Sequence, residues 1–246
     1  MQIGGLQKTT LIDYPGTVAC TVFTVGCNFS CPWCHNRELV TRKLFEESGR
    51  KLISEEDFWG FLEKRRGILD WVCITGGEPT LQVDLIDFCQ KINKMGLKIK
   101  LDTNGSRPEV IEKLLNVGAD NHPPVVDFVA VDFKVDRDNY GIVGVDNNLP
   151  VQKSMKLIIK SGIDYEFRTT VVPRVHSEEG LRKMAEEIGD ANPAGSLATL
   201  AGRWVWQNFR PQNCLDESWE KEGSYSKEEI EKIRNKINKK IRLRGW

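Results

Sequence analysis

Gly26-Cys27-Asn28-Phe29-Ser30-Cys31-Pro32-Trp33-Cys34-His35-Asn36 is the most informative stretch of the chain. It places three cysteines and one histidine within eleven residues. Three thiolates this close together can bind a metal ion or an iron–sulfur centre, and they leave at most one ligand position to be filled from elsewhere. The stretch directly follows Val18–Thr24, whose composition predicts a buried strand. The first expectation is therefore a ligand-binding loop at the end of a buried strand.

Strand and helix signals alternate along the rest of the chain. Further strands are expected at Trp71–Thr75, Lys98–Asp102, Asp127–Phe133, Asp164–Val172 and Arg203–Phe209. Helices are expected at Ser54–Arg66, Asp84–Met95, Pro108–Val117, Val151–Lys160, Ser177–Ile188 and Ser226–Arg242, and several end at a glycine. Six strand–helix units in series predict a parallel sheet with helices outside it. The expected fold class is α/β, a partial (β/α)6 barrel, with an open doubly wound sheet as the alternative.

No linker or low-complexity segment divides the chain, so one domain over residues 1–246 is expected. Within it we expect a turn-rich N-terminal extension over 1–17, which ends in Asp13-Tyr14-Pro15-Gly16. A β/α core over 18–210 and a C-terminal loop and helix over 211–246 should follow. Asp190–Gly202 and residues 211–225 are expected to be loops, and His122 and His176 ordinary loop residues.

Charge and hydropathy exclude several classes of protein. The chain has 35 basic and 35 acidic residues, a balance that argues against a nucleic-acid-binding protein. No secretory signal is evident, and no apolar run approaches the roughly 18 residues of a membrane span. A cytoplasmic protein without disulfides is expected, although the chain has seven cysteines. Cys20, Cys73 and Cys89 should be small buried side chains, whereas Cys214 lies in a polar segment.

Several kinds of site are compatible with the cysteine loop. Cys31-Pro32-Trp33-Cys34-His35 has the form of a c-type haem attachment site, and its first four residues that of a thioredoxin-type redox pair. Both alternatives leave Cys27 without a role. A structural zinc ion bound by Cys27, Cys31, Cys34 and His35 is possible by ligand count, but two adjacent ligands chelate awkwardly. A four-iron cluster held by three thiolates would leave one iron open to a substrate or cofactor.

Unusual residues follow each of the other predicted strands. Ligands bind at the carboxyl ends of the strands in parallel β/α folds, so these residues should share one rim with the cysteine loop. They are Gly76-Gly77-Glu78-Pro79, Thr103-Asn104-Gly105, Asp132 with Lys134, Val171-Val172-Pro173 and Gln207-Asn208-Phe209-Arg210.

Together these motifs carry a resemblance to a known family. Cys27-x3-Cys31-x2-Cys34, with Trp33 before the last cysteine, resembles the signature of the radical S-adenosylmethionine (SAM) enzymes, and Gly76-Gly77-Glu78-Pro79 resembles their second motif. Asp13-Tyr14-Pro15-Gly16, Gly26-Cys27-Asn28-Phe29 and Cys34-His35-Asn36 are similar to the activating proteins of glycyl-radical enzymes. Among these, the likeness is greatest to the activating protein of anaerobic ribonucleoside-triphosphate reductase.

This resemblance implies a cofactor set and roles for individual residues. Cys27, Cys31 and Cys34 would hold a [4Fe–4S] cluster whose fourth iron is chelated by the amino and carboxylate groups of SAM. Trp33 would offer its ring or backbone to the adenine, and the loop of Gly76, Gly77, Glu78 and Pro79 would accept hydrogen bonds from the methionine ammonium. The remaining implied SAM contacts are Asp102, Asn104, Asp132, Lys134 and Arg168, the two aspartates also being candidates for a monovalent cation. The family's histidine near the end of the sixth strand has no counterpart in Gln207–Arg210.

The implied reaction is reductive cleavage of SAM followed by hydrogen abstraction from a glycine Cα of a partner enzyme. The partner would be anaerobic ribonucleotide reductase, with a flavodoxin or ferredoxin as electron donor and with neither nucleic acid nor membrane involved. A radical SAM enzyme acting on a small molecule is the first alternative. A zinc-binding protein without catalysis is the second.

Overall fold

The computed structural model describes residues 1–14, 16–116, 123–192, 197 and 200–246. By their contacts these residues form two compact units. The first unit comprises residues 1–28, 36–103 and 109–129, and the second comprises residues 29–35, 104–108 and 130–246.

The first unit carries four strands in the order β1-β2-β3-β4. Their bounds are Ile3–Thr10, Ala19–Thr24, Trp71–Gly76 and Lys98–Thr103. β1 pairs antiparallel with β2, whereas β2 with β3 and β3 with β4 pair parallel. The helices are α1 (Arg42–Glu47), α2 (Glu55–Lys64), α3 (Leu85–Lys94) and α4 (Pro108–Leu114), with 3-10 helices at Arg37–Leu39 and Pro79–Leu81. Phe58 of α2 and Phe88 of α3 stack with centroids 5.0 Å apart in the core beside this sheet.

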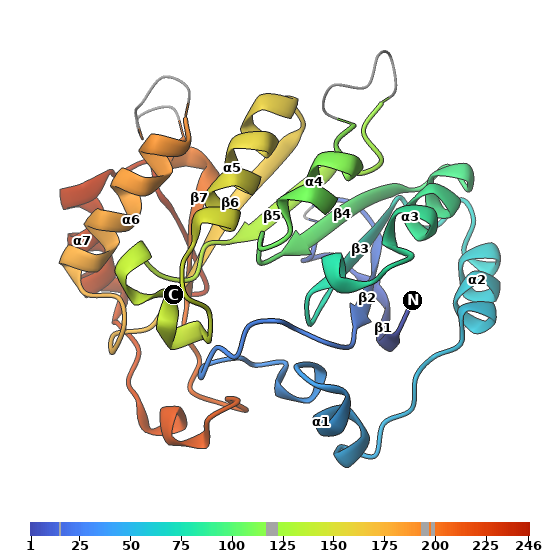
Figure 1. The fold of residues 1–246 in the computed structure, drawn as a ribbon, viewed down its shortest axis with the longest axis horizontal. Helices are drawn as coiled ribbons and strands as arrows, with labels where there is room; N and C mark the ends of the chain where they lie inside the picture. Colours follow the sequence, from blue (N-terminus) through green and yellow to red (C-terminus); the bar gives the residue numbers. More distant parts are fainter. Residues whose placement is uncertain (15, 117–122, 193–196, 198–199) are drawn as a thin grey trace. The chain divides into compact units, whose positions relative to one another are not determined.

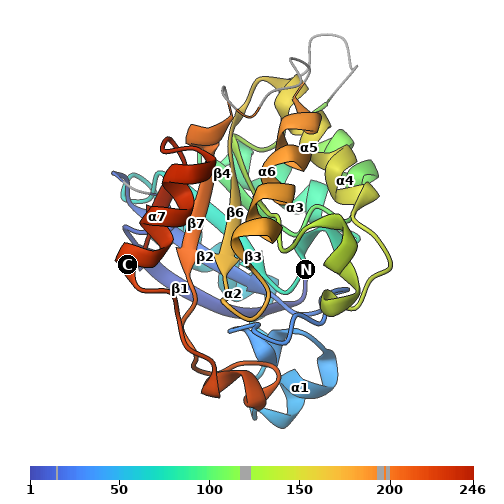
Figure 2. The same ribbon diagram turned by 90° about the vertical axis from the view of Figure 1, so that its left-hand side faces the viewer.

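The second unit carries the strands β5 (Phe128–Asp132), which begins in the first unit, β6 (Asp164–Val171), β7 (Trp204–Asn208) and β8 (Arg242–Arg244), in that order. β6 with β7 and β7 with β8 pair parallel. The helices α5 (Leu149–Ser161), α6 (Glu178–Ala191) and α7 (Lys227–Ile237) accompany these strands, and α6 lies in front of β6 in Figure 2. Three 3-10 helices lie at Arg137–Val143, Ala201–Arg203 and Glu217–Lys221.

Successive residues of β7 face opposite sides of the sheet, as a strand requires. Trp204 and Trp206 are fully buried on one side, with their rings edge to face at 5.2 Å. Their partners in β6 are Phe167 and Thr169, both also fully buried. The side that carries Val205 and Gln207 is therefore the one left for polar residues.

The α/β fold class predicted from the sequence is confirmed. Each of the six predicted strands coincides with one of β2 to β7 to within two residues at either end. The pairs β2–β3, β3–β4 and β6–β7 are parallel, as predicted. The predicted helices correspond to α2 to α7. Hydrophobic periodicity is sufficient to locate these strands and helices, because each strand is buried and each helix carries a single apolar stripe.

The N-terminal segment was predicted as turns, and this was wrong, because Ile3–Thr10 forms β1. Its pairing with β2 is irregular, with register shifts between Ile3 and Gly5 and between Gln7 and Thr10. Gly4 packs so closely that a Cβ atom there would lie 2.6 Å from the Val25 side chain. Glycine is thus needed for packing within this strand, although glycines in a sequence usually indicate turns.

The predicted last helix over Ser226–Arg242 was too long. α7 ends at Ile237, because Asn238 adopts an extended backbone, and residues 242–244 form β8. Ile241 is buried beyond the helix, so its helical spacing from Ile237 was coincidental. Arg242, where the predicted helix ended, and Arg244 are on this strand.

Smaller differences concern loops and helix ends. α6 continues through Gly189 to Ala191, and the predicted polar loop 211–225 contains the 3-10 helix Glu217–Lys221. α1 was not predicted. Pro15 of the predicted turn, the helix end predicted at Val117 and Gly118, His122 and most of Asp190–Gly202 lie outside the described residues.

Over the residues that the structure describes, no helix combines the length and the apolar character needed to cross a bilayer.

Candidate active site

The cysteine loop begins in the first unit, directly after β2. Gly26 has a φ of +102°, a conformation that residues with a Cβ rarely adopt. Its amide donates to the Leu39 carbonyl at 2.8 Å, and the amide of Cys27 donates to the Val40 carbonyl at 2.8 Å. The backbone at Cys27 is therefore held by the segment that follows the loop.

The other two cysteines of the motif lie in the second unit. The Ser30 amide donates to the Val143 carbonyl at 2.9 Å, and the Cys34 amide donates to the Cys31 carbonyl at 3.0 Å. Cys31 is 7% exposed, and Cys34 is more accessible. The turn closed by the second bond keeps these two cysteines in one short loop.

Trp33 packs inside the second unit. It is 4% exposed, and its ring lies 5.4 Å from that of Trp219 and 6.2 Å from that of His176, measured between centroids. The Asp216 amide donates to the Pro32 carbonyl at 3.0 Å, so the segment around Trp219 covers the cysteine loop.

Glycine is required at two positions of the Gly-Gly-Glu-Pro loop. A Cβ atom on Gly77 would lie 2.2 Å from the Gly26 carbonyl oxygen, and one on Gly76 would lie 2.4 Å from the Thr24 amide nitrogen. The Glu78 amide donates to the same Gly26 carbonyl at 2.7 Å. Within the first unit, the glycines therefore allow two loops to cross in direct backbone contact.

The Glu78 carboxylate is completely buried and turned into the protein. Its Oε1 atom accepts hydrogen bonds from the Thr80 amide at 3.0 Å, the Thr80 hydroxyl at 2.5 Å and the Thr103 hydroxyl at 2.7 Å. Pro79 begins the 3-10 helix that brings Thr80 into reach. Glu78 thereby fastens its loop to the end of β4, so its side chain shapes the loop.

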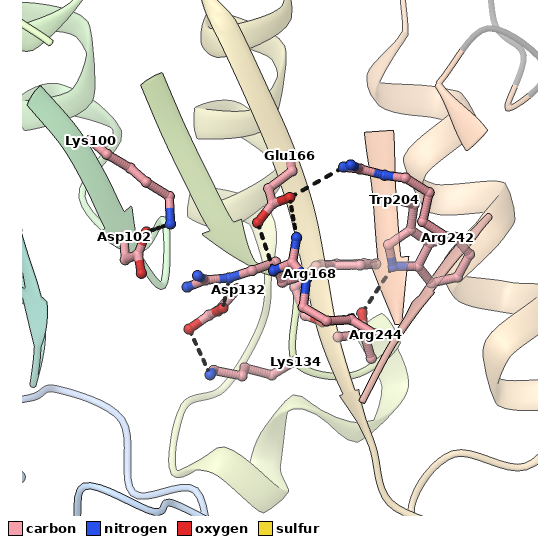
Figure 3. A network of polar contacts seen from close by, with 11 residues as sticks. Lys100, Asp102, Asp132, Lys134, Glu166, Arg168, Trp204, Arg242 and Arg244 are labelled. Carbon is pink, nitrogen blue, oxygen red and sulfur yellow. Dashed lines mark hydrogen bonds and ion pairs between the residues drawn. The ribbon is translucent and has the colours of Figure 1, made fainter. Parts of the chain in front are cut away.

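At the end of β4, Asp102 forms an ion pair with Lys100 at 3.0 Å (Figure 3). The Lys100 side chain is 6% exposed, so this lysine is a buried charge that sequence reasoning missed. The sequence does contain a sign of this ion pair, because a lysine stands inside the short strand Lys98–Thr103. Lysine is rarely buried without a partner of opposite charge. Asn104, in the second unit, is 5% exposed and accepts from the Ser106 amide at 2.9 Å.

In the second unit, Asp132 lies between two cations (Figure 3). Its Oδ1 atom accepts from Arg168 Nε at 2.9 Å, and its Oδ2 atom accepts from Lys134 Nζ at 3.0 Å. Burial alone would raise the pKa of Asp132, but Arg168 and Lys134 lower that pKa to about 2. Arg168 is thus paired, and the three side chains carry a net positive charge.

Lys134 also links this array to the cysteines of the second unit. Burial would lower the pKa of Lys134, but Asp132 and then Cys31 and Cys34 raise it above its usual value. A thiolate near a fixed ammonium group is stabilised, and thiolates are the ligands of iron–sulfur clusters. The donor chemistry of this loop therefore fits a cluster.

Among the described residues, no group of three or more His, Cys, Asp or Glu side chains is gathered as a ligand set for a single metal ion.

His176 is a structural residue that the sequence suggested was an ordinary loop histidine. It is 1% exposed; its Nδ1 atom accepts from the Val172 amide at 3.0 Å, and its Nε2 atom lies 2.7 Å from the Lys134 carbonyl. Burial lowers the pKa of His176 to about 4, so the imidazole is neutral near pH 7. It ties the end of β6 to Lys134.

A second charge array was also missed. Glu166, on β6, has a side chain that is 6% exposed and lies 3.2 Å from Arg242 Nη2 and 2.9 Å from Arg244 Nη2 (Figure 3). The signal was a glutamate within the otherwise apolar run Tyr165–Phe167, which needs a buried counterion. The sequence could not supply the partners, because Arg242 and Arg244 lie 76 and 78 residues away along the chain.

Comparison with known proteins gives relatives that extend over most of the chain. A Methanocaldococcus jannaschii protein, provisionally named as a glycyl-radical enzyme activating enzyme, is 29% identical over 97% of this chain and 92% of its own length. The pyruvate formate-lyase-activating enzyme of Clostridium pasteurianum is 28% identical over 76% of each chain. The 7-carboxy-7-deazaguanine synthase of Thermoplasma acidophilum is 29% identical over 65% of this chain and 70% of its own.

Two solved structures have the same fold. Streptococcus suis SuiB aligns with a TM-score of 0.62 and 13% identity over 92% of this chain, which spans only 48% of SuiB. Escherichia coli QueE aligns with a TM-score of 0.57 and 16% identity over 98% of this chain and 91% of its own. At these identities the similarity concerns the fold alone.

The resemblance drawn from the cysteine and Gly-Gly-Glu-Pro motifs is thereby confirmed at the level of the family. Residues 21–188, which include both motifs and the strands β3 to β6, match the radical SAM superfamily. The chain belongs to the radical SAM superfamily and is an enzyme of that type.

Proposed function

We propose that this enzyme cleaves SAM reductively and generates a glycyl radical on a partner enzyme, anaerobic ribonucleoside-triphosphate reductase. The observation that carries this proposal is the relative named for glycyl-radical enzyme activation, which matches almost the full length of both chains. The partner is inferred from the motifs around Asp13-Tyr14-Pro15-Gly16 and Cys34-His35-Asn36. A flavodoxin or ferredoxin would donate the electron, and the reaction would take place in the cytoplasm.

Cys27, Cys31 and Cys34 would hold a [4Fe–4S] cluster. When bound, the cluster supplies the electron that breaks the C5′–S bond of SAM, which gives methionine and a 5′-deoxyadenosyl radical. The protein residues would bind and orient SAM and keep water away from the radical. Closely spaced thiolates with a nearby ammonium group are suited to a cluster that carries negative charge.

The net positive array of the second unit would bind the SAM carboxylate. Asp132 sets the positions of Arg168 and Lys134 through bonds of 2.9 and 3.0 Å, and it neutralises only one of their two charges. The remaining positive charge lies next to the cysteines that influence Lys134. Asp132 would therefore act as a positioning residue, and Lys134 and Arg168 as direct contacts. Asn104 is proposed as a further polar contact, and Trp33 as a contact to the adenine through its backbone.

The first unit would recognise the methionine ammonium. The loop Gly76 to Pro79 would offer backbone carbonyls to it, and the shape of this loop is held by the Glu78 side chain, which is bonded to Thr80 and Thr103. Asp102 supplies a carboxylate at the end of β4, although Lys100 already balances its charge. Asp102 and Asp132 remain candidates for a monovalent cation, and an ammonium group or a cation would be attracted to the same carboxylates.

The test combines anaerobic reconstituted protein, reductant, SAM and the candidate reductase, with electron paramagnetic resonance as the readout. A glycine-centred radical on the reductase, accompanied by 5′-deoxyadenosine, is expected. A Cys31→Ala variant should give neither product. Formation of 5′-deoxyadenosine without a radical on any glycyl-radical enzyme would reject the partner, while the SAM chemistry would stand.

A second candidate function is a radical reaction on a small molecule, favoured by the 29% identity to a 7-carboxy-7-deazaguanine synthase. It predicts that 5′-deoxyadenosine formation is stimulated by a small metabolite and not by a protein. The non-catalytic zinc protein considered from the sequence is set aside, because residues 21–188 match a superfamily of enzymes.

A further inference from the structure

One cross-strand row of the second unit carries three polar side chains that the proposed SAM site does not use. Thr170 on β6 pairs with Gln207 on β7, and Gln207 pairs with Arg244 on β8. Directly paired residues of adjacent strands point to the same face of a sheet, so hydroxyl, amide and guanidinium groups lie side by side. The row is two residues beyond Arg168, toward the carboxyl ends of the strands, where ligands bind in parallel sheets.

A cavity opens at the end of this row. Its volume is about 290 Å³, and it is lined by Gly245 and by His35, Thr170, Gln207, Asn208, Arg210 and Arg244. All of these residues belong to the second unit. Two of the side chains are guanidinium groups, and none of the lining residues is acidic. The cavity is therefore positively charged and rich in hydrogen-bond donors.

The charge on this face exceeds what its carboxylates can neutralise. Glu166 is shared by Arg242 and Arg244, so one negative charge faces two positive ones. Arg210 adds an exposed guanidinium group at the end of β7. The arrangement repeats that of Asp132 between Arg168 and Lys134. In both arrays one carboxylate contacts two cations and leaves a surplus of positive charge.

Arg244 is preorganised for an anion by this contact. Its Nη1 and Nη2 atoms donate to the two Glu166 oxygens at 3.2 and 2.9 Å, while its side chain remains 44% exposed. His35 closes another side of the cavity: its ring stacks on Phe209 at 5.9 Å and hydrogen-bonds to the backbone of Arg210. A guanidinium group held in place loses less entropy when it binds a carboxylate or phosphate bidentately.

We propose that this cavity binds an oxyanion group of the substrate, a carboxylate or a phosphate, through Arg210 and Arg244 and separately from SAM. The inference rests on the proposed function only in treating the anion as part of the substrate whose hydrogen is abstracted. Such an anchor beside the cysteine loop would hold the substrate close to the site of radical formation. The group could belong to an acidic side chain of a protein partner or to a small acid, and both carry the same chemistry.

Binding can be tested without SAM turnover. Reconstituted protein is titrated by calorimetry at constant ionic strength with three probes. They are inorganic phosphate, a terminally capped glycine peptide that contains one glutamate, and the same peptide with glutamine in place of the glutamate. Arg210→Gln should weaken phosphate binding at least about tenfold, and Arg244→Gln should do the same. Arg182→Gln is the matched control, because Arg182 also pairs with a glutamate and is 49% exposed, but lies on α6 away from the cavity. It should bind as the wild type does.

The two arms distinguish the sources of the anion. Binding of the glutamate peptide but not of its glutamine twin points to a protein substrate, and binding of phosphate alone points to a small phosphorylated one. Equal binding by wild type and Arg210→Gln, or no binding of either probe, would overturn the proposal. A parallel loss of SAM affinity in Arg210→Gln would also overturn it, because the cavity would then be part of the SAM site. None of these readouts requires a glycyl radical, so failure of the proposed function would be seen separately.

Discussion

Replacing Thr103 by valine tests whether the buried Glu78 carboxylate organises the Gly-Gly-Glu-Pro loop. The Thr103 hydroxyl donates to Glu78 Oε1 at 2.7 Å, and the two residues are 2% and 0% exposed. Valine keeps the shape of threonine and removes the donor. Because a hydrogen bond to a charged group contributes about 1.5–3 kcal/mol, Thr103→Val should lower the free energy of unfolding by that amount.

Thr24→Val is the matched control in the same unit. Thr24 is also fully buried, but its hydroxyl donates to the neutral Thr75 carbonyl at 3.1 Å. A neutral hydrogen bond contributes about 1 kcal/mol, so the control should lose less stability than Thr103→Val. Urea unfolding of both variants, followed by circular dichroism under anaerobic conditions, measures the difference.

A double-mutant cycle with Glu78→Gln isolates the charged contact. If Glu78 is the partner of Thr103, the two substitutions should not be additive. The double variant should then lose less free energy of unfolding than the sum of the two single losses, by at least about 1 kcal/mol. Additive losses would refute the reasoning, and so would a Thr103→Val loss no larger than that of Thr24→Val. The SAM dissociation constant of Thr103→Val should rise too, since the backbone carbonyls of the loop would lose their support.

Three further predictions follow from single residues. Burial lowers the pKa of His176 to about 4, against about 6.5 in an unfolded chain, so the contribution of this residue to stability should be complete above pH 6.5. The free energy of unfolding should then fall by roughly 3 kcal/mol as the pH drops to 4. In His176→Gln the free energy of unfolding should depend less on pH in this range, and an unchanged pH dependence would contradict the prediction. Gly77→Ala should unfold at a clearly lower urea concentration, because its Cβ would lie 2.2 Å from a backbone oxygen. Gly60→Ala is the control, because Gly60 lies inside α2 with open space around it, and its free energy of unfolding should rise by up to about 1 kcal/mol. Equal effects of the two substitutions would argue against the loop crossing. Cys31→Ala should leave anaerobically reconstituted protein with little iron and without detectable 5′-deoxyadenosine, and SAM cleavage at the wild-type rate would refute its role as a ligand.

The two strands that sequence reasoning missed share one physical property. β1 and β8 are the first and last strands in the strand order, and neither shows a sustained alternation of apolar and polar residues. β8 is also only three residues long. Glycines in β1 serve close packing, which is not visible without the neighbouring side chain of Val25. Ile241 lies at helical spacing from the apolar residues of α7, but it is outside the helix, and its burial depends on tertiary contacts.

The amino-acid sequence by itself determined the α/β class, the six central strands, the loops at their carboxyl ends and the family, because these depend on local periodicity and on motifs within short stretches of chain. Only the tertiary structure decided which charges meet. Asp132 with Arg168, Glu78 with Thr103 and Glu166 with Arg244 are 36, 25 and 78 residues apart in the sequence. Burial of a charge requires such a partner, but the pattern of a single strand cannot say which distant residue provides it.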